Sequence, residues 1–201
     1  MHKQLLPSGP PGVGKTTLVR HICDSIRRTG VAIQGFYTEE VRETTGDGQR
    51  VRIGFDVVTT SGIRAPLART ADRMGKPGES SGRRVPFKVG KYVVDVAAFE
   101  SVVMPLLSVD KDSDAERPLL FVIDEIGKME MFSESFVAAV RTLFDSDNAR
   151  ILATVPLVRS PGSLPFVERL KARKDVKLCQ VSKSNRERLK VSLPAEVASM
   201  I

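Results

Sequence analysis

The sequence predicts an α/β fold in which a mainly parallel β-sheet, extended by antiparallel strands, lies between two layers of helices. A glycine-rich loop at residues 9–17 separates a short apolar run from an amphipathic helical pattern. A second apolar run, at residues 118–123, ends in two adjacent acids. Between these features, residues 36–58 form two β-like runs around a Gly-Asp-Gly turn, the pattern of an antiparallel hairpin.

Composition indicates one globular domain. The 201 residues suffice for a full core, and we expect a single domain over residues 1–201, with the hairpin and a basic loop inserted at about 35–96. No apolar run approaches the ~20 residues that cross a membrane, and the N-terminus leads straight into the first strand, so we expect neither a signal peptide nor a membrane partner. Cys23 and Cys179 lack metal-ligand spacing. They favour a reduced, cytoplasmic protein, with a nuclear location left open.

The net charge of +7 is concentrated in residues 64–91 and 169–190. Such clusters bind nucleic acid or attract an anionic nucleotide, and the bland alternative is solvated surface. Aromatic residues make up only 5% of the chain and Trp is absent, which leaves bases little to stack on. The sequence therefore disfavours polynucleotide binding without excluding it.

The first strand is expected at Leu5 and Leu6, with Pro7 already outside the sheet because proline cannot donate to a sheet ladder. The first helix is expected from Lys15 to about Arg28, since apolar residues recur there at three- and four-residue spacing and Thr-Gly follows.

The remaining elements follow the same rules. Extended segments are expected at 92–96, 118–123, 151–155 and 176–181, helices at 97–107, 133–145, 165–174 and 185–189, and a Gly/Pro-rich loop at 70–84. Ser133 is the expected N-cap of its helix.

The glycine-rich loop fits the phosphate-binding pattern G-x-x-x-x-G-K-[ST]. Its residues are Gly9, Pro10, Pro11, Gly12, Val13, Gly14, Lys15, Thr16 and Thr17. Glycines let backbone N–H groups turn inward around phosphates, and the following helix adds its positive dipole end. Lys15 would reach the β- and γ-phosphates and the Thr16 hydroxyl would ligate Mg²⁺. The alternative is a Gly/Pro-rich loop before an ordinary helix.

Asp124 and Glu125 form the second half of the predicted site. They follow a strand patterned for burial on both faces, and ligands bind at the carboxyl ends of such strands. Asp124 would hold Mg²⁺, and Glu125 would polarise a water for attack on the γ-phosphate. Taken alone, Asp124 is better explained as a cap for the next turn. Together with the loop, the pair predicts a three-layer P-loop NTPase sandwich and favours hydrolysis, since a kinase must exclude water.

The run Asp-Glu-Ile-Gly-Lys-Met-Glu at 124–130, with the P-loop and the block Gly-Phe-Tyr-Thr-Glu-Glu-Val-Arg at 35–42, resembles the cancer-related nucleoside-triphosphatase family, which includes enzymes from thermophiles. Blocks at 54–58, 66–69, 89–95 and 174–186 agree, so the resemblance spans about residues 5–190. One departure is Pro7-Ser8, where the family more usually has an apolar residue and Thr.

The resemblance implies a slow, Mg²⁺-dependent enzyme, monomeric or weakly associating. It would hydrolyse ATP, GTP, CTP and UTP to the diphosphate and phosphate. Carried over by position, residues 9–17 bind the triphosphate with Lys15 contributing to catalysis, Asp124 organises Mg²⁺, and Glu125 is the catalytic acidic residue.

Other residues have two interpretations each. Thr154 would sense the γ-phosphate or hold the water, or would pack as an ordinary strand-end residue. Glu39, Glu40 and Arg42 would approach the site if the hairpin folds over it, or would protect an edge strand from aggregation.

An arginine acting on the transition state is a further expectation, with Arg64, Arg69 and Arg159 as candidates. Asn185 and Arg186 are candidates for flanking the base.

Two other function classes stay open at this point. A nucleotide or nucleoside kinase would need an acceptor pocket and an Arg-rich lid, and residues 70–91 are basic enough to suggest one. A nucleotide-regulated switch that binds nucleic acid would lose affinity steeply as salt rises.

Overall fold

The computed structural model describes residues 2–73, 86–108, 118–158, 160 and 162–201. Its strands are β1 (Gln4–Gly9), β2 (Ala32–Thr44), β3 (Arg50–Thr59), β4 (Arg64–Thr70), β5 (Lys88–Val89), β6 (Tyr92–Val94), β7 (Leu119–Ile123), β8 (Arg150–Ala153), β9 (Val155–Pro156) and β10 (Val176–Gln180). Its helices are α1 (Lys15–Arg27), α2 (Val96–Val103), α3 (Glu134–Asp145), α4 (Pro165–Lys171) and α5 (Arg186–Met200), with 3₁₀ turns at Met104–Leu106 and Glu130–Phe132.

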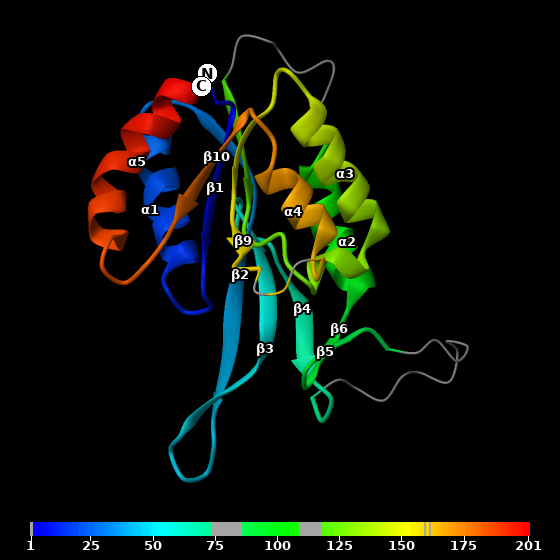
Figure 1. Cartoon of the computed structure of the whole chain (residues 1–201). Coiled ribbons are helices and arrows are strands. Elements are labelled where there is room, and N and C mark those ends of the chain that lie inside the picture. Colours follow the sequence, from blue (N-terminus) through cyan, green and yellow to red (C-terminus); the bar gives the residue numbers. More distant parts are fainter. Residues whose placement is uncertain (1, 74–85, 109–117, 159, 161) are drawn as a thin grey trace.

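These strands form one sheet in the order β10-β1-β8-β7-β2-β3-β4-β6-β5, with β9 also pairing with β1. The part from β10 to β2 is parallel, and the part from β2 to β5 is antiparallel. Figure 1 shows α1 and α5 on one face and α2, α3 and α4 on the other. The three-layer α/β fold, with its parallel sheet extended by antiparallel strands, is therefore confirmed.

Each face of the sheet has its own apolar core. On one face, α1 and α5 pack through residues at helical spacing against the sheet: Leu18, Val19, Ile22 and Ile26 from α1, and Leu189, Leu193 and Val197 from α5. On the other, Phe36, Phe99 and Phe136 stack edge to face, with ring centroids 5.2–6.1 Å apart. Among the described residues, no helix is long and apolar enough to cross a membrane.

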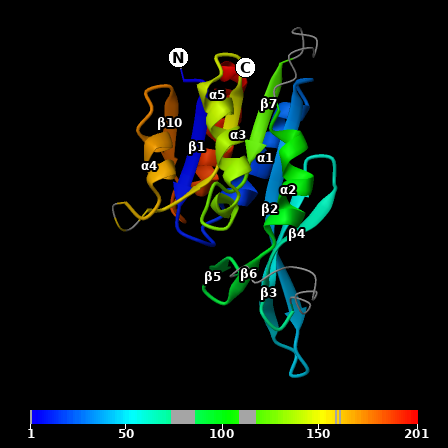
Figure 2. The same cartoon turned by 90° about the vertical axis from the view of Figure 1, so that its right-hand side faces the viewer.

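Strand β2 belongs to both parts of the sheet. Its first half pairs with β7 from Ala32 to Phe36, and its second half pairs with β3 as the predicted hairpin. Gly35 lies at the change, with φ 141°, where a Cβ would stand 1.9 Å from the Val122 carbonyl oxygen. Only glycine fits there. The hairpin therefore continues a central strand, and in Figures 1 and 2 it extends beyond the helical layers.

Pro7 is inside β1, contrary to the expectation that the strand ends before it. It pairs in register with Cys179 of β10 but has no register partner in β8 or β9. The pairing of β1 passes from β8 to β9 at this point. The missing N–H is tolerated because the ladder on that side is interrupted there.

Other boundaries also differ from prediction. The last helix was predicted to end near residue 189, but α5 continues through Pro194 to Met200, held by its packing on α1. Helix α4 ends at Lys171, three residues early, and β4 was not predicted at all. The expected strand at 151–155 is divided into β8 and β9 at Thr154. Most of the loop predicted at 70–84 lies outside the described residues.

Candidate active site

The P-loop connects β1 to α1. Gly12 and Gly14 have φ of 72° and 104°, which side-chain-bearing residues rarely adopt, and a Cβ on Gly9 would meet the Val181 carbonyl oxygen at 2.6 Å. Gly14 is the N-cap of α1, with no side-chain cap and no acid in the first turn. The positive end of the helix is therefore unneutralised, as an anion site requires.

Lys15 joins the two halves of the predicted site. Its side chain is 8% exposed, and its Nζ donates to the Gly9 carbonyl oxygen at 3.0 Å. The same Nζ lies 3.1 Å from Oε2 of Glu125, about 110 positions away in sequence. The P-loop and the Asp-Glu pair thus meet at one point.

Asp124 follows β7 and is almost fully buried. Oδ1 accepts a hydrogen bond from the Thr154 hydroxyl at 2.5 Å, and the backbone carbonyl oxygen accepts one from the Thr38 hydroxyl at 2.5 Å. Oδ2 has no hydrogen-bond partner among the described residues. Burial raises the pKa of this carboxyl, and the hydroxyls of Thr154 and Thr16 partly offset the rise.

These groups fit a Mg²⁺ ion. A hard cation prefers oxygen donors, and Mg²⁺ is often held by one or two carboxylates together with substrate phosphates and waters. The unpartnered Oδ2 of Asp124 and the hydroxyl of Thr16, which acts on the same carboxyl group, are such donors. Within the described part of the chain, no group of three or more His, Cys, Asp or Glu forms an all-protein metal cage.

The predicted site residues surround one cavity of about 1060 Å³. The lining includes Pro11, Gly12, Gly14, Lys15, Thr16, Thr17, Asp124 and Glu125. Gly9, Pro10 and Val13 support the loop from behind: the first two offer carbonyl oxygens to Lys15, and Val13 is buried in the core. Glu125, 30% exposed, faces both Lys15 and this space.

The hairpin forms the opposite wall. Glu39, Glu40 and Arg42 line the cavity, as expected if the hairpin folds over the site. Arg52, which sequence reasoning missed, lines it too, donating to Glu40 at 2.5 Å and lying over the Phe55 ring. The hairpin register pairs Arg42 with Arg52, so the available signal was the position of Arg52 opposite Arg42 across the predicted turn.

Two of the predicted transition-state arginines lie elsewhere. Arg64 and Arg69 both pair with the buried Asp56, Arg64 also pairs with Glu39, and neither lines the cavity. Arg159 lies outside the described residues. Arg42 and Arg52 are the arginines that the described lining offers instead.

The two residues expected near the base have separate roles. Atoms Cδ and Nη1 of Arg186 lie 3.8 and 3.9 Å from the point that a Cβ on Gly14 would occupy, so Arg186 flanks the P-loop. The Asn185 side chain instead fastens the turn before α5, accepting from the Ser182 N–H and donating to the Gln180 carbonyl oxygen, both at 2.8 Å.

Glu130 is a buried acid to which sequence reasoning gave no role. It is 4% exposed, and its carboxyl accepts the N–H of Gly127 at 3.1 Å. Burial, and then the nearby charge of Glu125, raise the pKa of Glu130 to about 8. An acid between Met129 and Met131 was the available signal for such burial.

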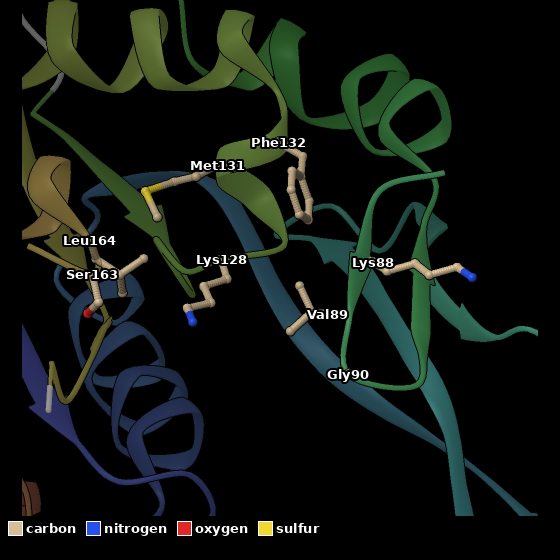
Figure 3. Close-up of a pocket in the computed structure, with 8 residues that line it drawn as sticks. All are labelled: Lys88, Val89, Gly90, Lys128, Met131, Phe132, Ser163 and Leu164. Carbon is tan, nitrogen blue, oxygen red and sulfur yellow. The ribbon is translucent and has the colours of Figure 1, made fainter. Parts of the chain in front are cut away.

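A second, smaller pocket of about 400 Å³ adjoins the cavity (Figure 3). It is lined by Lys88, Val89, Gly90, Lys128, Met131, Phe132, Ser163 and Leu164. Four of these, Val89, Lys128, Ser163 and Leu164, line the cavity as well, so the two spaces meet. Figure 3 shows the Lys128 side chain entering this space while Lys88 points away.

Known proteins resemble the whole of this architecture. The human cancer-related nucleoside-triphosphatase is 44% identical over 94% of this chain and 93% of its own, and nucleoside-triphosphatase THEP1 of Thermotoga maritima is 37% identical over 92% and 90%. The solution structure of a human cancer-related nucleoside triphosphatase superposes with a TM-score of 0.79 at 43% identity, covering 98% of each chain. The crystal structure of THEP1 from Aquifex aeolicus gives 0.76 at 29% identity, covering 96% of this chain and 98% of that one.

The family model described as NTPase matches residues 4–193, from the start of β1 into α5. That span includes the P-loop, the Asp-Glu pair and the hairpin wall of the cavity. The resemblance inferred from the motifs at 9–17 and 124–130 is thereby confirmed. The chain belongs to the NTPase family, whose named relatives are nucleoside-triphosphatases.

Proposed function

We propose that the protein hydrolyses nucleoside triphosphates to the diphosphate and inorganic phosphate, with Mg²⁺ and with broad tolerance of the base. The observation that carries this proposal is the 3.1 Å contact between Lys15 and Glu125 at the wall of one cavity. It brings a phosphate-binding cation and a carboxylate suited to activating water to the same place.

The P-loop supplies the triphosphate site. Backbone N–H groups of residues 9–17 and the open end of α1 face the β- and γ-phosphates, and Lys15 adds a cation. Lys15 exchanges its contacts with Gly9 and Glu125 for phosphate oxygens when nucleotide binds. As negative charge shifts on the transferred group, Lys15 stabilises it.

Thr16 and Asp124 would hold Mg²⁺. When bound, the ion neutralises charge on the phosphate oxygens. Thr154 has a defined part in this arrangement, because its hydroxyl fixes one oxygen of Asp124 and leaves the other free. The sequence suggested that Thr154 either senses the γ-phosphate or packs as an ordinary strand-end residue. We infer a third role, in which Thr154 orients the Asp124 carboxylate.

Glu125 would hold the attacking water. Its carboxylate accepts one proton while the water oxygen forms a bond to the γ-phosphorus and the bond from that phosphorus to the bridging oxygen breaks. The electron pair of the broken bond stays with the diphosphate. The proton then passes to the released phosphate.

The position of Arg186 beside the P-loop supports the proposal of base tolerance. A guanidinium plane stacks on any base without reading its edge, and this favours ATP, GTP, CTP and UTP alike. We expect the protein to act as a monomer.

A kinase is the second candidate function, favoured by the pocket in Figure 3. The pocket adjoins the cavity beside Lys128, and Lys128 has no ion pair within the described residues. A phosphorylated or hydroxyl-bearing acceptor seated there would receive the phosphoryl group in place of water. Phosphate release without any acceptor separates the two functions.

A nucleic-acid-regulated switch has weaker support. Many cations of the two basic segments are committed to acids within the fold: Arg64 and Arg69 to Asp56, Arg73 to Glu43, Arg173 to Asp145 and Asp175, and Lys177 to Glu196. Paired cations release fewer counterions from a polynucleotide. We expect turnover to be unchanged by added RNA or DNA.

The test is phosphate release from ATP and GTP with Mg²⁺ and no acceptor. Wild type is compared with Glu125→Ala and Lys15→Ala, and nucleotide affinity is measured in parallel. We expect steady release by wild type, release at least about 10²-fold slower by Glu125→Ala despite bound nucleotide, and weakened binding by Lys15→Ala. If wild type binds ATP and releases phosphate only after an acceptor or a polynucleotide is added, the protein is a kinase or a switch instead.

A further inference from the structure

We propose that Glu130 is a positioning residue that fixes the turn at residues 125–130 and thereby aims the carboxylate of Glu125 at Lys15 and the cavity. The inference rests on the proposed role of Glu125 in hydrolysis. It assigns to Glu130 no contact with nucleotide. Its effect passes through the backbone of Gly127.

Backbone and side-chain hydrogen bonds hold this turn at successive positions. The Ile126 N–H donates to the Thr154 carbonyl oxygen at 2.9 Å, and the Gly127 N–H donates to the Glu130 carboxyl at 3.1 Å. The Gly127 carbonyl oxygen accepts from the Met131 N–H at 3.1 Å. Removing Glu130 would leave the buried Gly127 N–H without its partner, and the segment carrying Glu125 would be released at that point.

Gly127 also brings the two carboxyl groups together. A Cβ on Gly127 would lie 2.9 Å from Oε1 of Glu125 and 3.0 Å from Oε2 of Glu130. A Cβ at 2.9 Å would require the Glu125 carboxyl to move, and the Glu130 carboxyl at 3.0 Å would have to give by a few tenths of an ångström. Because the φ of Gly127 is ordinary, the requirement for glycine here concerns this contact and not the backbone angle.

Both acids line the cavity, but their environments differ. Glu125 is part-exposed and contacts Lys15, whereas Glu130 is 4% exposed and accepts its hydrogen bond from Gly127 within the turn. The negative charges of Glu125 and Asp124 both contribute to the raised pKa of Glu130. With the pKa of Glu130 at about 8, its carboxyl is mostly neutral at pH 7 and does not repel the Glu125 carboxylate. A difference in burial of this kind lets two neighbouring carboxyl groups take separate roles, here Glu125 as the charged base and Glu130 as the neutral positioning group.

The experiment compares four variants. Glu130→Gln keeps the size and an oxygen acceptor for Gly127, Glu130→Ala removes both, and Gly127→Ala displaces the Glu125 carboxyl from its present position. Gly46→Ala is the matched control, because it lies in the hairpin turn with no atom within 4 Å of the added Cβ and no unusual φ. Each variant is measured for kcat, for nucleotide dissociation constant and for Tm.

We expect Glu130→Ala and Gly127→Ala to lower kcat about 10- to 100-fold, a part of the 10²- to 10⁴-fold that a general base contributes. Nucleotide affinity should stay within about twofold, because the P-loop is untouched. Glu130→Gln should retain kcat within about threefold at pH 7, and Gly46→Ala should match wild type. In a Glu125→Ala background, Glu130→Ala should cause no further loss, since residues that act as a unit are not additive.

Other outcomes overturn the inference. If Glu130→Ala lowers Tm but leaves kcat unchanged, Glu130 only stabilises the fold. If its loss adds fully to that of Glu125→Ala, the two residues act independently. Should Glu130→Ala fail to fold, Gly127→Ala and Glu130→Gln decide the question. The proposed function fails separately, and is recognised by hydrolysis that survives Glu125→Ala.

Discussion

Lys15 Nζ contacts Glu125 Oε2 at 3.1 Å and the Gly9 carbonyl oxygen at 3.0 Å, so one buried cation joins the P-loop to the acid that follows Asp124. The cation that should bind phosphate is held by the carboxylate that should activate water. We expect bound phosphates to compete with the Glu125 carboxylate for Lys15. A variant that lacks this negative charge should therefore change nucleotide affinity as well as turnover.

Glu125→Gln should separate these effects. The amide no longer holds Lys15 as an ion pair, so we expect ATP to bind with equal or higher affinity. The amide cannot accept the proton of water, so kcat should fall about 10²- to 10³-fold. Equilibrium binding and single-turnover phosphate release measure the two quantities. Glu134→Gln, at an exposed acid on α3, serves as the control; weaker ATP binding in Glu125→Gln would show that the ion pair does not oppose the nucleotide.

Thr154→Val should weaken Mg²⁺ binding. It keeps the shape of the side chain but removes the hydroxyl that donates to Asp124 Oδ1. Losing a partner of a metal-ligating carboxylate costs about 10- to 100-fold in metal affinity, and we expect about 10-fold here. Titration of phosphate release with Mg²⁺ measures the change.

Two variants accompany that experiment. Thr154→Ser should give the wild-type midpoint in the Mg²⁺ titration, because serine keeps the hydroxyl. Thr142→Val removes a hydroxyl from the exposed face of α3 and should have no effect. An unchanged midpoint in Thr154→Val would mean that Asp124 needs no fixed orientation.

Glu130→Gln should flatten the pH dependence of stability. The pKa of Glu130 rises from its ordinary 4.5 to about 8 on folding, so between these values the native state binds more protons than the unfolded state. The free energy of unfolding of wild type therefore falls as pH rises from about 4.5 to 8, by up to about 1.4 kcal/mol per pH unit from this group. Glutamine does not titrate and removes this slope. Urea unfolding at a series of pH values measures it, and parallel curves for the two proteins would contradict the prediction.

Gly35→Ala should be severely destabilising. The added Cβ would overlap the Val122 carbonyl oxygen between β2 and β7, and the φ of 141° is unfavourable in addition. We expect a loss of more than about 4 kcal/mol in the free energy of unfolding or failure to fold. Gly62→Ala is the comparison, with φ 94° and no atom within 4 Å, and should lose only about 1–2 kcal/mol. Equal losses in urea unfolding would show that the close approach carries no cost.

The central motifs could be predicted because phosphate chemistry restricts local sequence. The glycines of the P-loop, Lys15 and the acids after β7 follow from what backbone and side chains must do around a triphosphate, and the structure brings them to one cavity. Their chemical roles stay predictions until turnover is measured. The amphipathic pattern of α1 and the Ser133 cap of α3 are likewise local, and both are present.

What sequence reasoning missed depends on contacts between distant segments. Strand β4 contains Pro66 and has no clear alternation, and its place is set by pairing with β3 and β6. Arg52 reaches the site only through the hairpin register, and Glu130 only through burial of its turn. The last helix was predicted to end near residue 189, but burial of Val197 and Met200 continues α5 through Pro194.

Strand β2 connects the site to the tip of the projecting hairpin. Its root pairs with β7, the Thr38 hydroxyl is bonded to the carbonyl of Asp124, and the strand continues six residues further to Thr44. At about 3.3 Å per residue this outer arm is about 20 Å long. A tilt of a few degrees at its root would move atoms near Thr38 very little, but it would displace the hairpin tip by ångströms. A probe placed at the hairpin tip would therefore report a small tilt of β2 beside the site.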